Sequence, residues 1–298
     1  MSRDPDLFVG VTSWNSALFL PLCLRSVNKM TTGVAKRVVV LDNASTDRSV
    51  DIAKSEGCEV IVKVCNQPEA LNKLISLSDA RFTLLLHADV VLLYDGWFDL
   101  CRSRIERNRI LVSPEDIGCG PLSRPFGIGK PESSFLFFLT EEIRTTRFWR
   151  WRRRFAGLPV PESRVDFYGP HITHNLPERL TRAGFDWFPM DVHYSDTLDQ
   201  PIYVPPFKPP VWSEELGSLR YGLGNFYSID GHITHYHNWY DRLDKSTEID
   251  SRSTTNGPKD GFPSMYIRTY TESFIRDYKD GNVVVPDPIR SDRKPAAI

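Results

Sequence analysis

The stretch "RVVVLDNASTDRSVDIAKSEG", residues 37–57, decides the fold class. Residues 37–42 are rich in β-branched side chains, a composition typical of a strand that is buried on both faces of a sheet. Residues 45–57 then predict a helix that opens with Ser or Thr as the N-cap and closes on Gly57, the usual C-cap residue. A buried strand followed at once by a helix is the unit from which parallel sheets are built.

The same unit recurs along the first 120 residues. Short apolar runs alternate with segments of helical spacing, and the latter include one that carries Pro21 in its first turn. We predict strands at 7–13, 59–64 and 81–86, and helices at 16–30, 68–78 and 95–108. Repeated units of this length predict an α/β fold with a mainly parallel sheet and helices on both faces.

After residue 120 this regular alternation is lost, and Pro and Gly become frequent. The remaining pattern predicts a helix at 133–155, a strand-like segment at 224–237 and a helix at 264–281. We therefore divide the chain into a first half at 1–120, a second half of the same domain at 121–240, and a C-terminal extension at 241–298.

The composition is that of an ordinary globular protein, with 298 residues, 41% hydrophobic and 25% charged, and a formal net charge of −1. This charge gives no global reason to expect a nucleic-acid partner. The five cysteines form no CxxC pair and leave an odd one over, which suits a reducing compartment. No apolar run reaches the roughly 18 residues of a membrane span. We expect a cytoplasmic protein, with peripheral membrane contact left open.

Polar side chains follow the predicted strands at the point where each one ends. In open α/β sheets, ligands bind outside the carboxyl ends of the strands. We therefore expect these residues to converge on one crevice: Thr12, Ser13, Asp42, Asn43, Asn66 and the "HAD" sequence His87-Ala88-Asp89.

The order of these signals resembles a known family, the inverting, nucleotide-sugar-dependent glycosyltransferases of family 2, which have the GT-A fold. The resemblance covers roughly residues 7–240 and rests on six motifs in order: "VTSWN" (11–15), "DNASTD" (42–47), "NQPEALNKL" (66–74), "HAD" (87–89), "GFDWF" with "YSD" (184–196), and "ITHYH" (233–237). It implies transfer of a sugar from a UDP- or TDP-sugar to a hydroxyl acceptor, a glycan or a lipid-linked group. It also implies a divalent cation, Mn²⁺ or Mg²⁺, at the diphosphate.

By this resemblance, Asp42 accepts a hydrogen bond from the uracil or thymine imide, and Trp14 and Asn43 frame the base. The wider nucleotide-binding set is Thr12, Trp14, Asp42, Asn43, Asn72, His87 and Ala88. The alternative for Asp42 is that it caps the following helix, because "DNASTD" is also a good capping sequence. We favour binding for Asp42 and capping for Ser45, Thr46 and Asp47.

Asp89 is the metal ligand that the resemblance implies. His87 stands where the family usually has a carboxylate, which lowers the negative charge of the site. His235 and His237 lie two apart in a predicted strand and face the same way, so either could complete a metal site with Asp89. The order of motifs favours His235. The alternative is that both are hydrogen-bonded structural histidines, and His171, His174 and His193 stay unassigned.

Inversion needs a carboxylate that takes the proton from the attacking hydroxyl. The family position of this base falls near Ser195-Asp196, which makes Asp196 the first candidate and Asp191 the second. The Glu that precedes the family's Asp is missing before Asp196.

The segment "RFWRWRRRF", residues 147–155, places five arginines among four aromatics. A surface helix docked on the core, a contact with a membrane interface or a lipid diphosphate, and a nucleic-acid contact all fit this pattern, and nucleic acid is the least favoured. Two other functions compete with glycosyl transfer. A nucleotidyltransferase would need a Gly-rich basic loop after the first strand, which "VTSWNS" lacks. A non-catalytic nucleotide-sugar-binding module is suggested by His87.

Overall fold

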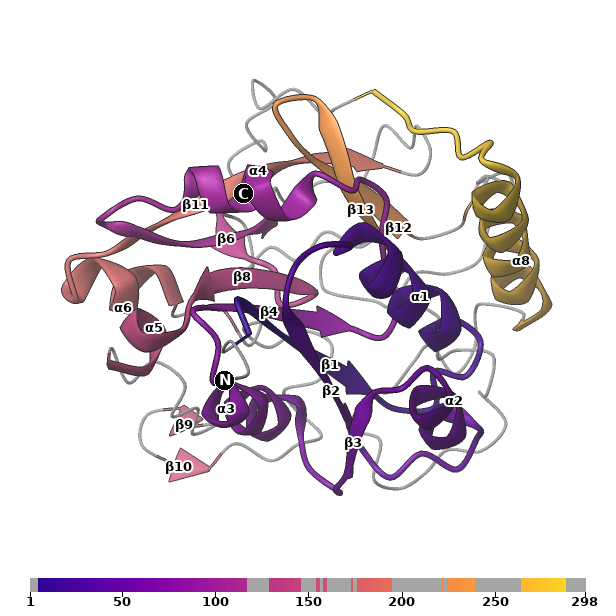
Figure 1. The fold of residues 1–298 in the computed structure, drawn as a ribbon, viewed down its shortest axis with the longest axis horizontal. Coiled ribbons are helices and arrows are strands. Elements are labelled where there is room, and N and C mark those ends of the chain that lie inside the picture. Colours follow the sequence, from indigo (N-terminus) through magenta and orange to yellow (C-terminus); the bar gives the residue numbers. More distant parts are fainter. Residues whose placement is uncertain are drawn as a thin grey trace.

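A computed structural model describes residues 5–116, 129–145, 154–155, 158–159, 173, 176–194, 221, 224–238 and 264–287 (Figure 1). Its strands are β1 (Leu7–Ser13), β2 (Lys36–Asp42), β3 (Glu59–Val62), β4 (Phe82–His87), β5 (Val90–Leu92), β6 (Arg109–Asp116), β7 (Lys130–Pro131), β8 (Phe135–Leu139), β9 (Arg154–Phe155), β10 (Leu158–Pro159), β11 (Asp186–Tyr194), β12 (Gly224–Ile229) and β13 (His232–Asn238). Its helices are α1 (Leu20–Met30), α2 (Ser49–Ser55), α3 (Gln67–Leu77), α4 (Trp97–Arg104), α5 (Thr140–Thr145), α6 (Leu176–Arg182) and α8 (Ser264–Asp280).

One large sheet runs through the molecule in the order β3-β2-β1-β4-β8-β6-β11-β12-β13-β5, with β7 paired to β6. The strands β3, β2, β1 and β4 are parallel, as are β6 and β11, and the other neighbours are antiparallel. The predicted α/β class is therefore confirmed. Its parallel part lies mostly in the first half of the chain, and antiparallel strands extend it.

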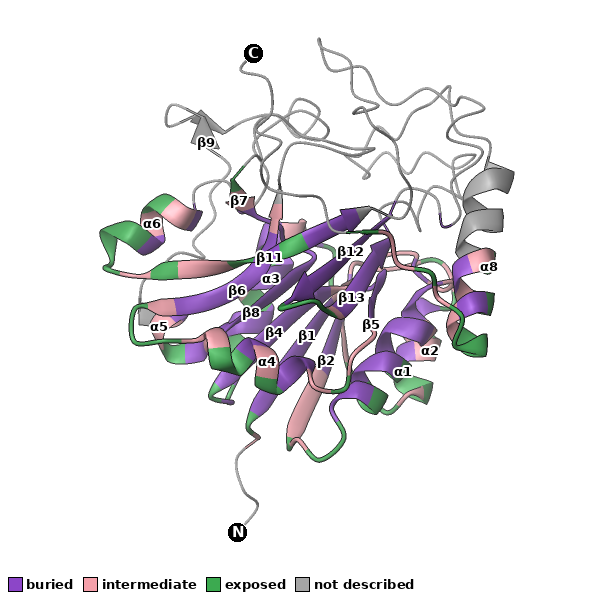
Figure 2. Ribbon diagram, turned by 90° about the horizontal axis from the view of Figure 1, so that it is seen from above, coloured by how far each residue is buried: buried purple, intermediate pink, exposed green. Residues whose placement is uncertain are grey.

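Helices cover both faces of this sheet, as predicted. Along β1, Leu7, Val9 and Val11 pack in the core with α1, α2 and α4, whereas Phe8 packs on the opposite face with α3, α5 and α6. At Gly10 a Cβ atom would lie 3.1 Å from the Leu74 side chain of α3, so glycine allows α3 to pack closely on β1. Figure 2 shows the buried strands in the middle of the molecule and exposed residues on the outer helices.

Helix α2 begins at Ser49, several residues after the predicted start. The residues before it are held in a turn, because the Asp42 carboxylate accepts hydrogen bonds from the Ser45 backbone and hydroxyl. The predicted end of this helix is confirmed, since Gly57 adopts a left-handed φ of +76° just after it.

The prediction of one helix at 133–155 is wrong. Residues 135–139 form strand β8 between β4 and β6, and only 140–145 are helical. The run Phe135–Phe138 is buried on both faces of the sheet, which gives an apolar stretch without clear periodicity. Most of the arginine-rich segment 147–155 lies outside the described residues; the backbone of Arg154–Phe155 forms a short strand rather than a helix.

The strand-like segment at 224–237 is a hairpin of two strands, β12 and β13. Its turn residues Asp230 and Gly231 both have positive φ, the conformation of a tight two-residue hairpin turn. The predicted C-terminal helix is confirmed as α8, whose Phe274 stacks on Tyr236 of β13 with ring centroids 4.0 Å apart. The division of the chain at residues 120 and 240 remains a prediction.

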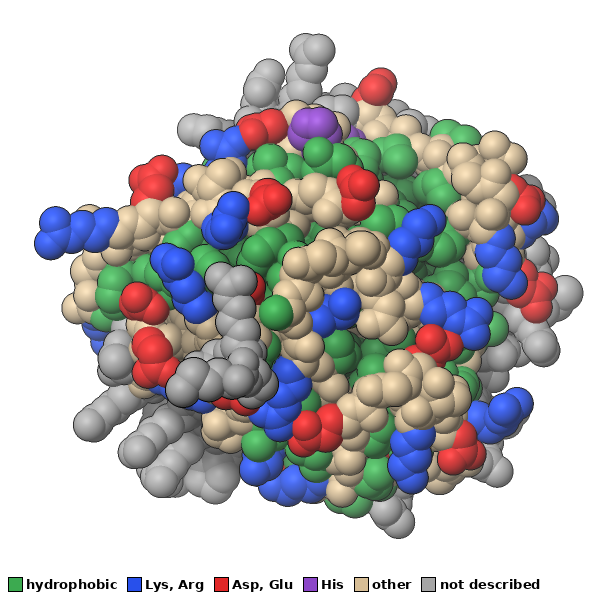
Figure 3. Space-filling view, viewed as in Figure 1, with side chains coloured by type: hydrophobic (Ala, Val, Ile, Leu, Met, Phe, Trp, Pro, Cys, Tyr) green, Lys and Arg blue, Asp and Glu red, His purple; other side chains and the backbone are tan. Residues whose placement is uncertain are grey.

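Acidic and basic side chains are interspersed on the face shown in Figure 3, where the described residues form no broad field of one sign. Among the described residues, no helix is both long enough and apolar enough to cross a membrane.

Candidate metal and nucleotide site

The carboxyl ends of three neighbouring strands bring predicted site residues together. In the sheet register, Ser13 on β1 is the partner of Asp42 on β2, and Thr12 is the partner of His87 on β4. The Ala88 backbone donates a hydrogen bond of 3.0 Å to the Thr12 carbonyl. The predicted convergence at one sheet edge is therefore present in the backbone.

Asp42 is fully buried, and its two carboxylate oxygens accept hydrogen bonds from the Ser45 N–H (2.7 Å) and the Ser45 hydroxyl (2.6 Å). The Ser45 hydroxyl in turn accepts from the Asn15 N–H at 2.7 Å. The N-cap of α2 is Arg48, whose own side chain makes no capping hydrogen bond, but the Asp47 carboxylate accepts a hydrogen bond of 3.0 Å from the N–H of Ser49, the first residue of the helix. Asp42 therefore stabilises the turn before α2 and does not cap the helix. Its contact with a base remains a prediction.

The other nucleotide candidates lie around this turn. The Asn43 side chain accepts a hydrogen bond of 2.8 Å from the Cys65 N–H, which fixes the chain after β3. Trp14, next to the end of β1, and Asn72 on α3 are both half-buried. Asn66 forms a capping box at the start of α3 with Glu69. The roles of Trp14, Asn43 and Asn72 in nucleotide binding remain predictions.

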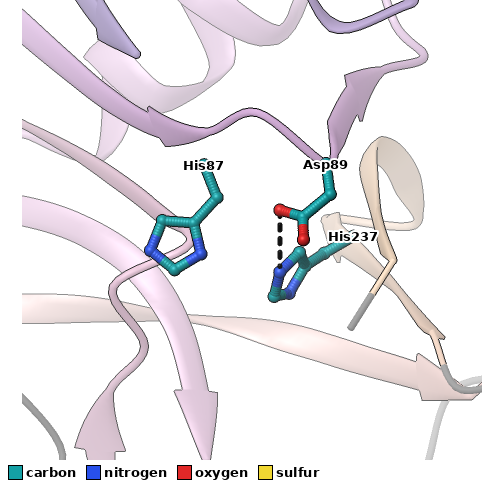
Figure 4. A group of neighbouring side chains, drawn as sticks. All are labelled: His87, Asp89 and His237. Carbon is teal, nitrogen blue, oxygen red and sulfur yellow. Dashed lines mark ion pairs between the residues drawn. The ribbon is translucent and has the colours of Figure 1, made fainter. Parts of the chain in front are cut away.

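Strand β5 begins directly after "HAD" and pairs antiparallel with β13, with Val90 opposite His237. The Asn238 N–H also donates a hydrogen bond of 3.0 Å to the Asp89 carbonyl. This pairing brings His237 of β13 close to the "HAD" sequence that follows β4. Figure 4 shows His87, Asp89 and His237 converging, and their ligand atoms all lie within 4.8 Å of one another.

Asp89 and His237 are buried, with 4% and 5% of their surface exposed, whereas His87 is half-buried. The His87 ring is held by hydrogen bonds with the Gln67 amide and with the Ser133 hydroxyl, the latter at 3.3 Å. One carboxylate and two imidazoles within this distance form a donor set that fits a divalent metal ion.

Two carboxylates face the two ring nitrogens of His237. Its Nε2 lies 3.4 Å from Asp89 Oδ1, and its Nδ1 lies 3.0 Å from Glu132 Oε1. Burial alone would lower the pKa of His237, but the charge of Asp89 and hydrogen bonds to Asp89 and Glu132 raise its pKa to about 9. At neutral pH, the metal-free site therefore holds an imidazolium between two carboxylates.

Glu132 was not a candidate in the sequence analysis. Burial alone would raise its pKa, but hydrogen bonds from His237 and Tyr227 lower its pKa to about 2. The residue follows β7 in a Gly- and Pro-rich stretch, and its partner Tyr227 lies 95 residues further along the chain. No local pattern marks such a long-range contact.

His235 lies deeper in the core than His237. Its ring stacks between Phe135 and Tyr227, with centroid distances of 4.4 and 4.7 Å, and its Nδ1 is 2.9 Å from the Thr234 hydroxyl. Burial, followed by repulsion from His237, lowers the pKa of His235 to about 3. The metal-ligand group found among the described residues contains His237 and not His235, although the order of motifs favoured His235.

The sequence of residues 8–156 matches the profile of glycosyl transferase family 2. The chain belongs to glycosyl transferase family 2. This match covers half of the chain and includes Asp42 and the "HAD" sequence, and the fold class expected from the family resemblance agrees with the observed sheet. No curated protein sequence matches this family-2 chain.

Several solved structures are similar to this family-2 chain at low identity. The mannosyltransferase PcManGT from Pyrobaculum calidifontis, in complex with GDP-Man and Mn²⁺, has a TM-score of 0.45 at 13% identity, with 63% of this chain and 55% of that chain covered. Glucosyl-3-phosphoglycerate synthase from Mycobacterium tuberculosis, in complex with Mn²⁺, UDP and glucosyl-3-phosphoglycerate, has a TM-score of 0.45 at 15% identity, with 62% and 68% covered. TarS from S. aureus has a TM-score of 0.38 at 14% identity, with 48% and 49% covered. The chain thus spans about half to two thirds of the length of these proteins.

Of the two base candidates of this family-2 chain, Asp191 lies among the described residues and Asp196 does not. Asp191 is exposed on β11, opposite Ser228 of β12. Asp196 and Ser195 lie outside the described residues, as do His171 and His174. His193 makes structural contacts with both ring nitrogens, which lie 2.8 Å from the Pro286 carbonyl and 2.8 Å from the Ser228 hydroxyl.

Proposed function

We propose that this family-2 chain is a metal-assisted glycosyltransferase that moves a sugar from a UDP- or TDP-sugar to a hydroxyl acceptor with inversion. One observation carries this proposal: His87, Asp89 and His237 gather their ligand atoms within 4.8 Å at the sheet edge where Asp42 also lies. Ligands of open α/β sheets bind at this edge.

The donor set favours Mn²⁺ over Mg²⁺. Imidazole nitrogen is a good ligand for first-row transition metals, whereas Mg²⁺ prefers oxygen ligands only. Asp89 and His237 would hold the cation, with His87 as the third ligand. When bound, the cation offsets the negative charge that develops on the diphosphate leaving group. Because Asp89 and His237 are buried, their contribution to this charge balance is weakly screened by solvent.

The residues of β1 and β2 would bind the nucleotide. Asp42 would accept from a base N–H, and the Trp14 ring would pack against the base. The backbone around Ala88 would lie beside the diphosphate, because it joins Thr12 to the metal site. In this arrangement, the first half of the chain supplies the contacts to the nucleotide.

The acceptor and the base belong to the second half in this proposal. Inversion requires a carboxylate on the face of the sugar opposite the diphosphate, and Asp196 or Asp191 would supply it. A glycan or a lipid-linked acceptor fits a hydroxyl nucleophile. Peripheral membrane contact through residues 147–155 would suit a lipid-linked acceptor.

The first experiment tests the donor and metal site. Asp89→Ala should abolish Mn²⁺-dependent UDP binding, measured by calorimetry with and without Mn²⁺, because the variant lacks the carboxylate ligand. Asp95→Ala removes an exposed carboxylate in the loop after β5 and serves as the matched control. Equal UDP binding by the wild type, with and without Mn²⁺, would rule out a metal role.

The second experiment tests the base. Asp196→Asn should lower the transfer rate by roughly 10²–10⁴-fold and leave donor binding nearly intact, because the amide keeps the size and loses the basicity. Normal transfer by Asp196→Asn together with a loss in Asp191→Asn would assign the base to Asp191. The anomeric configuration of the product, read by proton NMR, decides between inversion and retention.

A further inference from the structure

Glu132 is a buried carboxylate beside the metal-ligand group that the proposed mechanism leaves unused. Only 8% of its surface is exposed, and its backbone N–H donates a hydrogen bond of 2.9 Å to the Pro114 carbonyl. It lies just before β8 and contacts His237 at Nδ1, whereas Asp89 contacts the same ring at Nε2. A buried carboxylate is costly unless hydrogen bonds satisfy it, so its partners indicate its role.

Both oxygens of Glu132 have specific partners. Oε1 lies 3.0 Å from Nδ1 of His237, and Oε2 accepts a hydrogen bond of 2.6 Å from the Tyr227 hydroxyl. The Tyr227 hydroxyl also accepts from the Asn225 amide at 3.3 Å. These contacts hold one oxygen of the Glu132 carboxylate against β12 while the other oxygen faces the His237 ring.

The two ring nitrogens of His237 have different neighbours. Nδ1 faces Glu132, whereas Nε2 faces Asp89, at 3.4 Å. Asp89 belongs with His87 and His237 to the group of possible metal ligands. An imidazole that donates its Nδ1 proton to a carboxylate keeps the lone pair of Nε2 for a metal ion. Such outer carboxylates fix both the tautomer and the orientation of metal-binding histidines.

We propose that Glu132 is the positioning residue of the metal site, holding Nδ1–H of His237 so that Nε2 is presented to the cation beside Asp89. This inference rests on the proposed metal site. It adds a residue from outside the family motifs to that site. Glu132 touches neither the donor nor the cation in this proposal and acts only through His237.

The test measures metal affinity in the full-length protein. Mn²⁺ is titrated alone and then with UDP, and the free ion is counted from its electron paramagnetic resonance signal. Glu132→Gln should weaken Mn²⁺ binding by roughly 10-fold and Glu132→Ala by roughly 100-fold, the range found when outer-shell partners are removed. Gln keeps an acceptor oxygen for Nδ1–H, so its loss should be the smaller one.

The matched control is Asp277→Asn on α8. Asp277 is also a buried carboxylate that accepts a hydrogen bond from a tyrosine, at 2.9 Å from the Tyr221 hydroxyl. This variant makes the same carboxylate-to-amide change among the residues that pack around Phe274. It should leave the Mn²⁺ affinity unchanged even where it lowers the melting temperature.

A second readout separates positioning from mere stability. Co²⁺ bound in place of Mn²⁺ gives a visible absorption spectrum that reports the ligands and their geometry. Glu132→Gln should change this spectrum, whereas a purely structural role would lower the melting temperature and leave the spectrum of the folded variant intact. Wild-type affinity and an unchanged spectrum in both Glu132 variants would overturn the proposal. Failure of the wild type to bind Mn²⁺ in either titration would instead overturn the metal site itself.

Discussion

Two buried carboxylates at one edge of the sheet are stabilised in opposite ways. Asp42 is satisfied within its own turn, by two hydrogen bonds from Ser45 three residues later. Asp89 meets His237, which arrives only through the pairing of β5 with β13. The Asp42 side of the proposed site is therefore built from local contacts, and the Asp89 side from contacts across the whole chain. Changes to the second half should affect the metal and spare the Asp42 turn.

Removing His237 should give the largest effect and separate the two regions most clearly. His237→Ala leaves Glu132 and Asp89 buried without their shared partner, and breaking a buried pair in this way typically costs about 3–5 kcal/mol. Urea denaturation measures that loss, and the Mn²⁺ titration should show no specific site. His232→Ala, an exposed histidine on the same strand, is the control. Stability close to wild type in His237→Ala would contradict the buried pairing.

The pH dependence of Mn²⁺ affinity and of stability should test the contacts of His237 separately from the Asp42 turn. Because the pKa of His237 is raised to about 9, metal must displace a proton, and Mn²⁺ affinity should rise about 10-fold per pH unit from pH 7 towards pH 9. The metal-free protein should respond in the opposite sense. A folded-state pKa above the ordinary value of 6.5 gives stability that is complete below pH 6.5 and lost as the pH rises through about 9.

Calorimetry across this range, together with melting temperatures of the metal-free protein, measures both trends. The stability trend should vanish in His237→Ala. A Mn²⁺ affinity that is flat between pH 7 and pH 9 would show that His237 does not bind the metal.

The smallest effect on stability is expected for a change at Asp42, whose hydrogen bonds come from Ser45 in the same turn. Asp42→Asn keeps one acceptor oxygen but replaces the other with an amide, so one Ser45 donor loses its acceptor at a cost of about 1–3 kcal/mol. It should weaken UDP binding, measured by calorimetry, while Mn²⁺ binding alone stays near wild type. Ser45→Ala is the comparison variant, since it disturbs the turn and keeps the carboxylate. Equal loss of UDP affinity in both variants would mean that Asp42 acts only through the turn.

The same division explains what the sequence could predict. In the first half, helical and strand periodicities alternate cleanly, so the elements from β1 to α3 and the placing of Asp42 and Asp89 at strand ends followed from local patterns. The helix predicted at 133–155 was wrong because "FLFF" has no period of its own and both sheet faces bury it. Burial on two faces is a property of the sheet order, which no short window contains.

The site divides in the same way. The prediction of one strand-like segment at 224–237 did not use the Asp230-Gly231 pair, although an Asp-Gly pair between two strand-like runs is a signal for a tight hairpin. The choice between His235 and His237 was not readable, since both lie on the same face of β13 and only the packing of Phe135 and Tyr227 separates them. Glu132 could not be predicted from sequence either, because its partners Tyr227 and His237 lie far along the chain.

The antiparallel pairing of β5 with β13 also sets an order of events during synthesis. The Asp42 turn needs only Ser45 and Asn15, so all of its parts leave the ribosome with the first fifty residues. Asp89 emerges long before His237 and Asn238, and contacts of such large sequence separation form slowly because the chain between them must first be ordered. A growing chain therefore carries a finished Asp42 turn beside an unfinished group of metal-ligand candidates, and the proposed metal site is complete only when β13 is in place.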